Sequence, residues 1–346
     1  MTHRDVRRTT LGIDLGDKQS DVCVLGSEGA VVRRFRVKTT SSGFQGRLAH
    51  WAGARAVVEV GTHSPWVSRL LSAMGFEVIV ANANKVGLIG HSFKKTDAHD
   101  AEVLAKLGQL DPSLLSPIQH RSETAQKDLM MLRARDGVVA SRTQMVNSVR
   151  GFVKALGQRC PSSSTSKFTE RVRESLEEGL FPGLAELLEV IDVLSEKIRV
   201  LDQAVKDACH RYPATSRLQQ ISGVGATTAL CYVLTLEDPR RFGRSRDVGS
   251  FLGLVPRQRE SGERKPRLRI TKAGDRTLRR LMVQAAQYIL GPFGPETDLR
   301  AFGLALAERS GKKKGVVATA RKLSILLHHL WVTGADYRPQ REVAPT

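Results

Sequence analysis

The sequence has few cysteines, few aromatic residues and no uninterrupted apolar run long enough to cross a membrane. Cys23, Cys160, Cys209 and Cys231 show neither Cys-x-x-Cys spacing nor a histidine at zinc-ligand intervals, so we expect reduced thiols. The most apolar stretch, residues 316–332, contains arginine, lysine and histidine, which excludes a bilayer span. The N-terminus has no apolar core of signal-peptide length. These absences predict a cytoplasmic protein without membrane contact.

Acidic residues are scarce relative to basic ones. The 346 residues include 54 Lys and Arg against 35 Asp and Glu, a net charge of +19. Such an excess favours a polyanionic partner, and nucleic acid is the first candidate because its phosphates bind basic proteins strongly. The hydrophobic content of 41% is that of an ordinary globular chain with a substantial core.

The first hundred residues alternate β-rich and helical patterns. Three consecutive strands joined by short turns are followed by segments that alternate between helix and strand. The expected strands are residues 10–15, 21–25, 31–37, 56–60 and 76–81, and the expected helices are residues 43–52, 65–74 and 97–110. This order is typical of an α/β RNase H-like domain.

The middle of the chain has the pattern of long helices. Residues 123–156 contain few helix breakers, and a Ser-rich segment at residues 160–166 separates them from a heptad pattern at residues 184–208. This seam either closes a hairpin within one chain or joins two protomers. We therefore predict an RNase H-like domain at 1–115, a coiled-coil region at 120–212, a mostly α-helical domain at 213–338 and a tail at 339–346.

Two acidic residues stand inside apolar strand patterns. Asp14 lies in LGIDLG and Glu59 in AVVEVG, where buried strands ordinarily carry apolar residues. Asp97 and Asp100 lie three residues apart at the start of a predicted helix. Taken singly, Asp14 can cap a turn, and the two helical aspartates can cap a helix and stabilise its dipole.

Together, the four carboxylates form the constellation with which RNase H-like nucleases hold two divalent metals for displacement at phosphorus. An all-oxygen ligand set suits Mg²⁺, and Mn²⁺ is an alternative. The nearby acids Asp17, Asp21 and Glu102 are interpreted as solvated surface residues.

The C-terminal third is rich in glycine and arginine. The Gly223-Val-Gly225 segment resembles the turn of a helix-hairpin-helix, which presents backbone N–H groups to a phosphate, although a purely structural turn is nearly as common. Residues 257–280 contain ten Lys or Arg and three acids. Candidate nucleic-acid contacts are Gly223, Gly225, Arg257, Arg259, Arg264, Lys265, Arg267, Arg269, Lys272, Arg276, Arg279, Lys312, Lys313 and Lys314.

Ser261 lies within this basic region, next to Gly262. A hydroxyl there would meet a scissile phosphate among guanidinium groups that stabilise its developing charge. Spacing alone favours a simple Ser-Gly turn, because no general base can be assigned.

Several motifs taken in order resemble the DEDD transposases of insertion sequence family 110, now also called bridge-RNA-guided recombinases. The resemblance covers nearly the whole chain, in the blocks GIDLGDKQSDV, VVEVGTHSPWV, KKTDAHDAEVLA, ISGVGATTA, RFGRSRDVGSFLGLVPRQRESG and RITKAGDRTLRRLMVQAA. One departure is Asp275, where many relatives are expected to carry Asn.

The resemblance implies that Asp14, Glu59, Asp97 and Asp100 are the DEDD tetrad of a domain similar to Holliday-junction resolvases. It implies that Ser261 is a catalytic nucleophile that becomes linked to DNA. It also implies a dimer or tetramer in which the tetrad of one protomer meets the serine domain of another, and a structured guide RNA encoded by the element.

The resulting hypothesis is a transposase that cuts and exchanges DNA strands at element ends and target, in the bacterial cytoplasm at the nucleoid. Its first alternative is a structure-specific nuclease of the resolvase type, in which water attacks DNA and Ser261 is only part of a turn. Its second is a non-catalytic nucleic-acid scaffold, which four clustered acids in a basic protein argue against.

Overall fold

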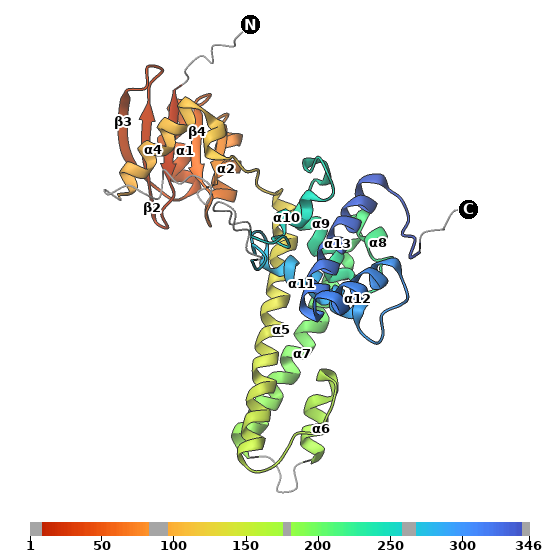
Figure 1. The fold of residues 1–346 in the computed structure, drawn as a ribbon. Helices are drawn as coiled ribbons and strands as arrows, with labels where there is room; N and C mark the ends of the chain where they lie inside the picture. Colours follow the sequence, from red (N-terminus) through yellow and green to blue (C-terminus); the bar gives the residue numbers. More distant parts are fainter. Residues whose placement is uncertain (1–8, 83–95, 176–180, 258–267, 341–346) are drawn as a thin grey trace, which may run out of the picture. The chain divides into compact units, whose positions relative to one another are not determined.

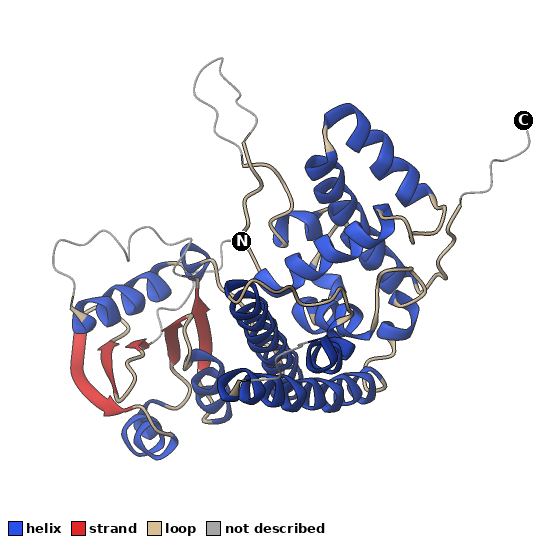
Figure 2. Cartoon of the chain, turned by 90° about the horizontal axis from the view of Figure 1, so that it is seen from below, coloured by secondary structure: helices blue, strands red, loops and turns tan. Residues whose placement is uncertain are grey.

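The computed structural model describes residues 9–82, 96–175, 181–257 and 268–340, and it divides the chain into two compact units. The first unit comprises Met1–Arg121 and the second Ser122–Thr346. Among the described residues, strands occur only in the first unit, and the second is built from helices (Figure 1, Figure 2). The chain is therefore a mixed α/β protein, with a sheet domain compatible with the RNase H fold.

The first unit contains a five-stranded sheet with the order β3-β2-β1-β4-β5. Its strands are β1 (Thr10–Asp14), β2 (Gln19–Leu25), β3 (Val31–Lys38), β4 (Arg55–Glu59) and β5 (Glu77–Ala81). The first three run antiparallel to one another in sequence order, whereas β4 is parallel to both β1 and β5. The carboxyl ends of β1 and β4 therefore meet at one edge of the sheet, which places Asp14 and Glu59 in neighbouring strands.

Helices cover both faces of this sheet. On one face, α1 (Ser41–Leu48), the short 3-10 helix η1 (Ala49–Trp51) and α2 (Ser64–Ala73) enclose a core that includes Ile13, Phe44 and Leu71. On the other face lies α4 (Asp97–Leu110), followed by η2 (Pro112–Leu115). The helix predicted over residues 97–110 is confirmed with the same bounds, and the other predicted elements of this unit are confirmed to within a few residues.

The second unit begins with two long helices that pack against each other, α5 (Glu123–Ala155) and α7 (Pro182–Cys209). Between them lie η3 (Thr165–Lys167) and α6 (Phe168–Ser175). A small separate core lies where α5 ends and α7 begins, which we call the distal end of the hairpin; it includes Val149, Phe168, Leu184 and Ile191. The predicted apolar seam of α7 is therefore buried within this chain, as an intramolecular hairpin.

The rest of the second unit packs around the proximal end of that hairpin. Leu129 and Val205 of the hairpin share one hydrophobic core with the following helices. Those helices are α8 (Ala214–Leu218), α9 (Ala226–Leu236), η4 (Pro239–Arg241), α10 (Asp247–Phe251), α11 (Arg276–Leu290), α12 (Asp298–Ser310) and α13 (Lys312–Thr333). The proposed division of this unit at residue 212 stays a prediction.

Within the described residues, no helix is both long enough and apolar enough to cross a membrane.

Candidate active site

Helix α4 lies directly against strand β1, and a glycine makes this approach possible. A Cβ atom at Gly12 would stand 1.9 Å from the carbonyl oxygen of Ala101 and 2.5 Å from the amide nitrogen of Ala105. Asp14 follows Gly12 by two strand residues, about 6.6 Å, and Asp97 precedes Ala101 by four helical residues, about 6 Å. The start of α4 is thereby brought beside the carboxyl end of β1.

The other end of α4 is held by a buried arginine. The Arg55 side chain donates from Nη1 to the carbonyl oxygen of Gly108 at 2.7 Å. Its remaining nitrogens bind both carboxylate oxygens of Glu77 at 3.3 and 3.1 Å. A cation at the carbonyl end of a helix is favoured by the helix dipole. Arg55 therefore fixes the helix whose first turn carries Asp97 and Asp100.

The Asp14 carboxyl has a strongly raised pKa. Partial burial is the largest cause that raises its pKa from 3.8 to about 6, and the negative charges of Asp97, Asp100 and Glu59 contribute to the rise in that order. Like charges shift a pKa appreciably only when they lie near one another. The structure thus brings together all four carboxylates that the sequence singles out, at the edge where β1, β4 and α4 meet.

A fifth acid, Asp21, belongs to the same surroundings. It is the direct cross-strand partner of Asp14 and adds to the rise of that residue's pKa, while its own carboxylate binds Nε of Arg36 at 3.2 Å. Glu102 is likewise engaged, in ion pairs with Arg34 and Lys106 at 2.6 Å each. The interpretation of Asp21 and Glu102 as solvated surface acids was therefore incomplete, because cross-strand and helix–strand pairing is not visible in the sequence.

The four carboxylates influence one another through their charges without forming a closed ligand set. Among the described residues, no three His, Cys, Asp or Glu side chains are arranged so that they could hold a metal ion. The donor chemistry nevertheless fits a divalent cation, because four carboxylates supply only oxygen ligands. Their mutual repulsion, which the pKa of Asp14 records, is what a bound cation would relieve.

In the second unit, the glycine-rich turn predicted at residues 223–225 joins α8 to α9. Gly223 has a φ of +89°, and a Cβ there would stand 3.0 Å from the Tyr288 ring and 3.2 Å from the carbonyl oxygen of Ala285. Gly225 is exposed and precedes α9 without a side-chain cap on the first amides. The turn lies between two helices, as predicted, and a helix-hairpin-helix contact with phosphate at this turn stays a prediction.

Ser261 and the basic residues Arg259, Arg264, Lys265 and Arg267 lie outside the described residues. The chain on either side of them is held in register, because Pro256 and Ile270 form an antiparallel bridge and the Arg257 amide donates to the Arg269 carbonyl at 2.9 Å. Just beyond the bridge, Gly253 and Gly274 let two backbone segments cross, since a Cβ on either would come within 2.3 Å of a backbone atom. The segment that contains Ser261 thus starts and ends at a rigid base.

Arg279 belongs to this base. It donates from Nη1 to the carbonyl oxygens of Ala273 at 2.6 Å and Leu252 at 3.1 Å, which ties the two crossing segments to α11. Asp275 caps the same helix by accepting from the Leu278 amide at 2.8 Å, a role that Asn fulfils equally well. The departure at Asp275 therefore leaves the start of α11 intact.

The remaining predicted contacts are exposed cations. Arg257, Arg269, Lys272 and Arg276 surround the base of the undescribed segment, and their side chains are solvent-accessible. Lys312, Lys313 and Lys314 occupy the first turn of α13, where positive charge opposes the helix dipole. An anionic partner would explain a local energetic disadvantage of this kind, and these contacts stay predictions.

Comparison with known proteins places these features in a common context. A family model described as Transposase, for the DEDD transposases of the IS110 type, matches residues 11–157. A second, for the Transposase IS116/IS110/IS902 family, matches residues 215–299. The first segment contains all four carboxylates, and the second contains the glycine-rich turn and Ser261.

Individual relatives extend the similarity along the whole chain. A transposase for insertion sequence element IS1111A from Coxiella burnetii is 28% identical over 336 residues, which are 95% of this chain and 91% of the relative. A transposase for insertion sequence element IS1328 from Yersinia enterocolitica is 29% identical, and the matched region covers 81% of this chain and 83% of that relative. A putative transposase from Sinorhizobium fredii is 28% identical, covering 83% and 74%.

Proposed function

Because the chain belongs to the IS110 family of DEDD insertion-sequence transposases and is a DNA transposase, we propose that it exchanges DNA strands through a serine-linked intermediate. Its two working parts are the carboxylate tetrad Asp14, Glu59, Asp97 and Asp100, and the nucleophile Ser261. The observation that carries the cation-dependent part of the proposal is geometric: β1 and β4 are parallel neighbours and α4 packs against β1, which brings the four carboxylates together, and their charges and burial raise the pKa of Asp14 to about 6. Four acids so placed in a protein of net charge +19 favour a cation-dependent reaction on phosphate over a purely structural role.

The tetrad is proposed to hold Mg²⁺, or Mn²⁺ in its place. When bound, the ion supplies positive charge to the phosphate oxygens on which negative charge develops. The protein's contribution is to position the ligands. Gly12 and Arg55 set the place of α4 against the sheet, so that Asp97 and Asp100 lie beside the strand ends bearing Asp14 and Glu59.

Ser261 is proposed to attack a DNA phosphate with its hydroxyl oxygen. The bond between this oxygen and phosphorus forms as the bond from phosphorus to the leaving DNA oxygen breaks. The serine loses its proton and the leaving oxygen gains one, so the number of phosphate ester bonds is unchanged and the strand can be rejoined elsewhere. The basic residues at the base of this segment, Arg257 and Arg269 among them, are proposed to bind the phosphates on either side.

Two partners besides DNA are implied by the family resemblance. A structured guide RNA encoded by the element would select donor and target by base pairing, so the protein itself would read mainly shape and phosphate. A dimer or tetramer would join the tetrad of one protomer to Ser261 of another. The outer side of α7 supports such assembly, because Val190, Val193 and Val200 are 44%, 58% and 55% exposed and fall on one helical face.

The decisive experiment is recombination in cells between a plasmid carrying the native element ends and a target plasmid, with sequencing of the junctions. We expect Ser261→Ala and Asp14→Asn each to abolish junctions while nucleic-acid binding persists. Ser216→Ala and Glu28→Gln are matched controls, because both residues are exposed and lie away from the tetrad and the basic segment. Denaturing gels of the wild-type reaction should contain a protein–DNA adduct that Ser261→Ala lacks.

Normal recombination by Ser261→Ala would overturn the serine mechanism and favour the alternative, hydrolysis by water as in a Holliday-junction resolvase. Normal recombination by Asp14→Asn would remove the tetrad from catalysis. Deletion of the element's non-coding end outside the cleavage sites tests the guide RNA separately, since loss of junctions should then be restored by supplying that RNA in trans.

A further inference from the structure

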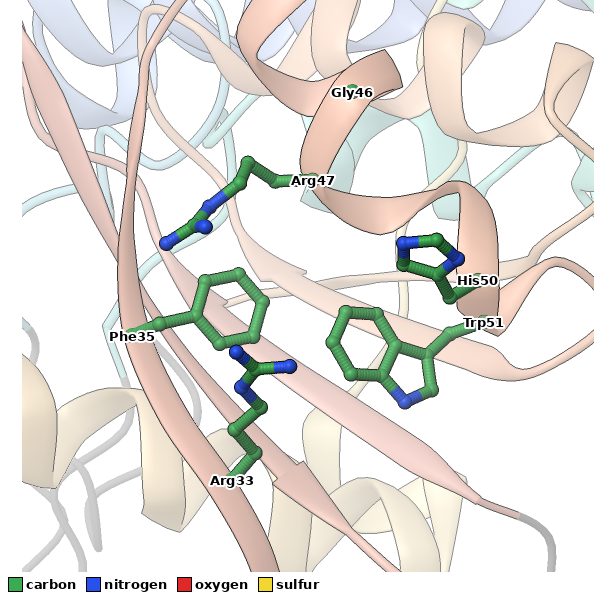
Figure 3. A pocket seen from close by; sticks show the side chains of 6 residues that line it. All are labelled: Arg33, Phe35, Gly46, Arg47, His50 and Trp51. Carbon is green, nitrogen blue, oxygen red and sulfur yellow. The ribbon is translucent and has the colours of Figure 1, made fainter.

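A basic and aromatic pocket lies on the sheet face opposite α4. The hollow has a volume of about 150 Å³ and is lined by Arg33 and Phe35 of β3, Gly46 and Arg47 of α1, and His50 and Trp51 of η1 (Figure 3). We call this hollow the β3 pocket. None of its residues belongs to the tetrad or to the basic C-terminal segment.

Two aromatic rings form the wall of the β3 pocket. The Phe35 and Trp51 rings stack with centroids 5.4 Å apart and planes inclined by only 14°, and the His50 ring meets Trp51 edge-on at 6.3 Å. Both Phe35 and Trp51 also pack against the core of the first unit. The wall is thus rigid on its inner side and partly open to solvent on its outer side.

Two guanidinium groups flank the same ring. The Cζ atoms of Arg33 and Arg47 stand 5.7 and 5.4 Å from the centre of the Phe35 ring, and both side chains point toward it (Figure 3). In the part of the first unit that the structure describes, neither guanidinium forms an ion pair, whereas Arg34 and Arg36 on the same strand bind Glu102 and Asp21. On β3, the arginines that face α4 are therefore paired with carboxylates, whereas Arg33, which faces the pocket, has no carboxylate partner within the described residues.

From this geometry we propose that the β3 pocket binds an unpaired nucleotide of a single-stranded segment of nucleic acid, its base stacked on Phe35 and Trp51 and its phosphates bound by Arg33 and Arg47. Aromatic stacking and cations are the two features with which proteins bind single strands without reading sequence. Basic residues on an edge strand also prevent unwanted sheet pairing, but that purpose does not require two stacked rings.

The energetics favour entry of a base. Each exposed cation–π contact between arginine and Phe35 is worth about 0.5–1 kcal/mol, whereas stacking of a base on an aromatic side chain is worth about 1–3 kcal/mol. The guanidinium groups can turn outward to phosphates at little cost, because no carboxylate within the described residues holds them. A duplex cannot use the pocket in this way, since its bases are already stacked and paired.

The pocket also lies near the tetrad across the sheet. Asp14 pairs with Asp21 and Asp21 pairs with Arg36, so two strand spacings, about 10 Å, separate the backbone of β1 from that of β3 at this level. Because the pocket lies on the sheet face opposite α4 and β3 is an edge strand, a nucleic-acid strand held beside Phe35 would have to pass around the edge of the sheet to reach the carboxylates. Binding of a nucleotide in the β3 pocket requires neither a metal ion nor Ser261, so it is independent of the proposed mechanism.

The test uses the full-length protein with Trp66→Phe and Trp331→Phe, which leaves Trp51 as the sole tryptophan. Oligothymidine and oligouridine of about 12 nucleotides are titrated in EDTA, and Trp51 fluorescence is recorded alongside the anisotropy of a labelled copy. We expect the single strands to quench Trp51 as a base stacks on it, and a duplex of equal length to bind without this quenching. The comparison of DNA with RNA identifies which strand the pocket prefers.

Variants then separate stacking from charge. Phe35→Leu keeps an apolar side chain at this position but removes the π face, and we expect a loss of quenching and single-strand binding weakened about 5-fold to 100-fold. Arg33→Ala and Arg47→Ala should each lower the salt slope of binding by about 0.7. The matched controls are Lys38→Ala, an exposed cation of the same strand, and Phe302→Leu, an exposed ring that contacts Lys322 outside the pocket.

Binding of single strands with no change in Trp51 fluorescence would overturn the proposal. So would equal quenching by the duplex, or equal effects of Phe35→Leu and Phe302→Leu on affinity.

Discussion

Replacement of Asp14 by Asn is expected to stabilise the metal-free protein at neutral pH, against the usual effect of changing an active-site residue. The pKa of Asp14 is raised from 3.8 to about 6 in the folded chain. A group with a raised pKa binds its proton more tightly when folded, so its protonation favours folding. The stability contributed by this proton is fully present below pH 3.8 and is lost as the pH rises through about 6.

The magnitude is set by the same shift. A difference of about 2 pKa units corresponds to about 3 kcal/mol of folding free energy. Solvent screening of this partly exposed carboxylate reduces the stability lost when Asp14 is charged to roughly 1–2 kcal/mol. Above pH 6, wild-type protein folds with Asp14 charged among Asp97, Asp100 and Glu59. Asn removes that repulsion at nearly unchanged volume. The stability difference between Asp14→Asn and wild type should therefore be near zero at about pH 4 and grow to its full value by about pH 7.5.

Urea unfolding in EDTA measures this difference, provided that the signal comes from the first unit alone. Trp51 and Trp66 lie in the first unit and Trp331 in the second, so a Trp331→Phe background makes tryptophan fluorescence report only the sheet domain. Glu28→Gln removes one exposed charge from the same unit and should change little at either pH. In Mg²⁺ at about pH 7.5, wild type should gain more stability than Asp14→Asn, because only wild type retains all four ligands.

A stability difference that is the same in acid and at neutral pH would refute the reasoning. Destabilisation by Asn at neutral pH in EDTA would show that Asp14 makes a favourable contact that outweighs the repulsion of its neighbours.

Two further predictions concern the positioning of the elements. Gly12→Ala places a Cβ 1.9 Å from the Ala101 carbonyl oxygen, so we expect the first unit to lose roughly 1–3 kcal/mol and recombination to fall with all four carboxylates intact. Gly46→Ala, at a helix position of the same unit with no atom within 4 Å, serves as the stability control and should lose no stability, because Ala is favoured over Gly in a helix. Unchanged unfolding and recombination of Gly12→Ala would mean that α4 tolerates displacement. The Asp128 carboxylate of α5 accepts hydrogen bonds from Arg211 and from the Tyr212 hydroxyl, just beyond the end of α7. Asp128→Asn removes the negative charge of this acceptor, so the free energy of unfolding of the second unit, measured in urea, should fall by about 1–3 kcal/mol. Asp202→Asn, which loses a more exposed pair with Arg135, should cost less than about 1 kcal/mol, and an equal effect of the two variants would contradict the assigned burial.

The sequence predicts most of the sheet domain because local patterns and the sheet agree there. Short β-rich runs locate all five strands, and helical spacing of apolar residues locates α4, although its cap is Thr96 rather than one of the aspartates. The carboxylates were recognisable because Asp14 and Glu59 interrupt otherwise apolar strands. The seam of α7 is equally periodic, but periodicity is identical for a seam within one chain and a seam between two chains. Only packing distinguishes them, as in the small core that joins α7 to α5 and α6.

Other features depend on contacts between segments far apart in the sequence, and no local pattern reveals them. Arg279 looks like a surface cation of an amphipathic helix, yet its guanidinium binds two carbonyl oxygens of the crossing segments at the base of the Ser261 segment. Gly253 and Gly274 look like ordinary loop residues until their backbones are seen to cross. The β3 pocket combines a strand with a 3-10 helix that follows it by more than ten residues.

The distribution of paired and unpaired arginines separates structural from functional charge better than composition does. A net charge of +19 states only that the protein prefers polyanions. Arg55, Arg279 and Arg300 donate to carbonyl oxygens, so part of the basic excess holds the fold together. Arg33 and Arg47 have only an aromatic ring beside them within the described residues, and a phosphate would be a stronger partner than that ring. Nucleic-acid contacts are therefore best sought where cations lack such protein acceptors, which directs attention to the β3 pocket and to the first turn of α13.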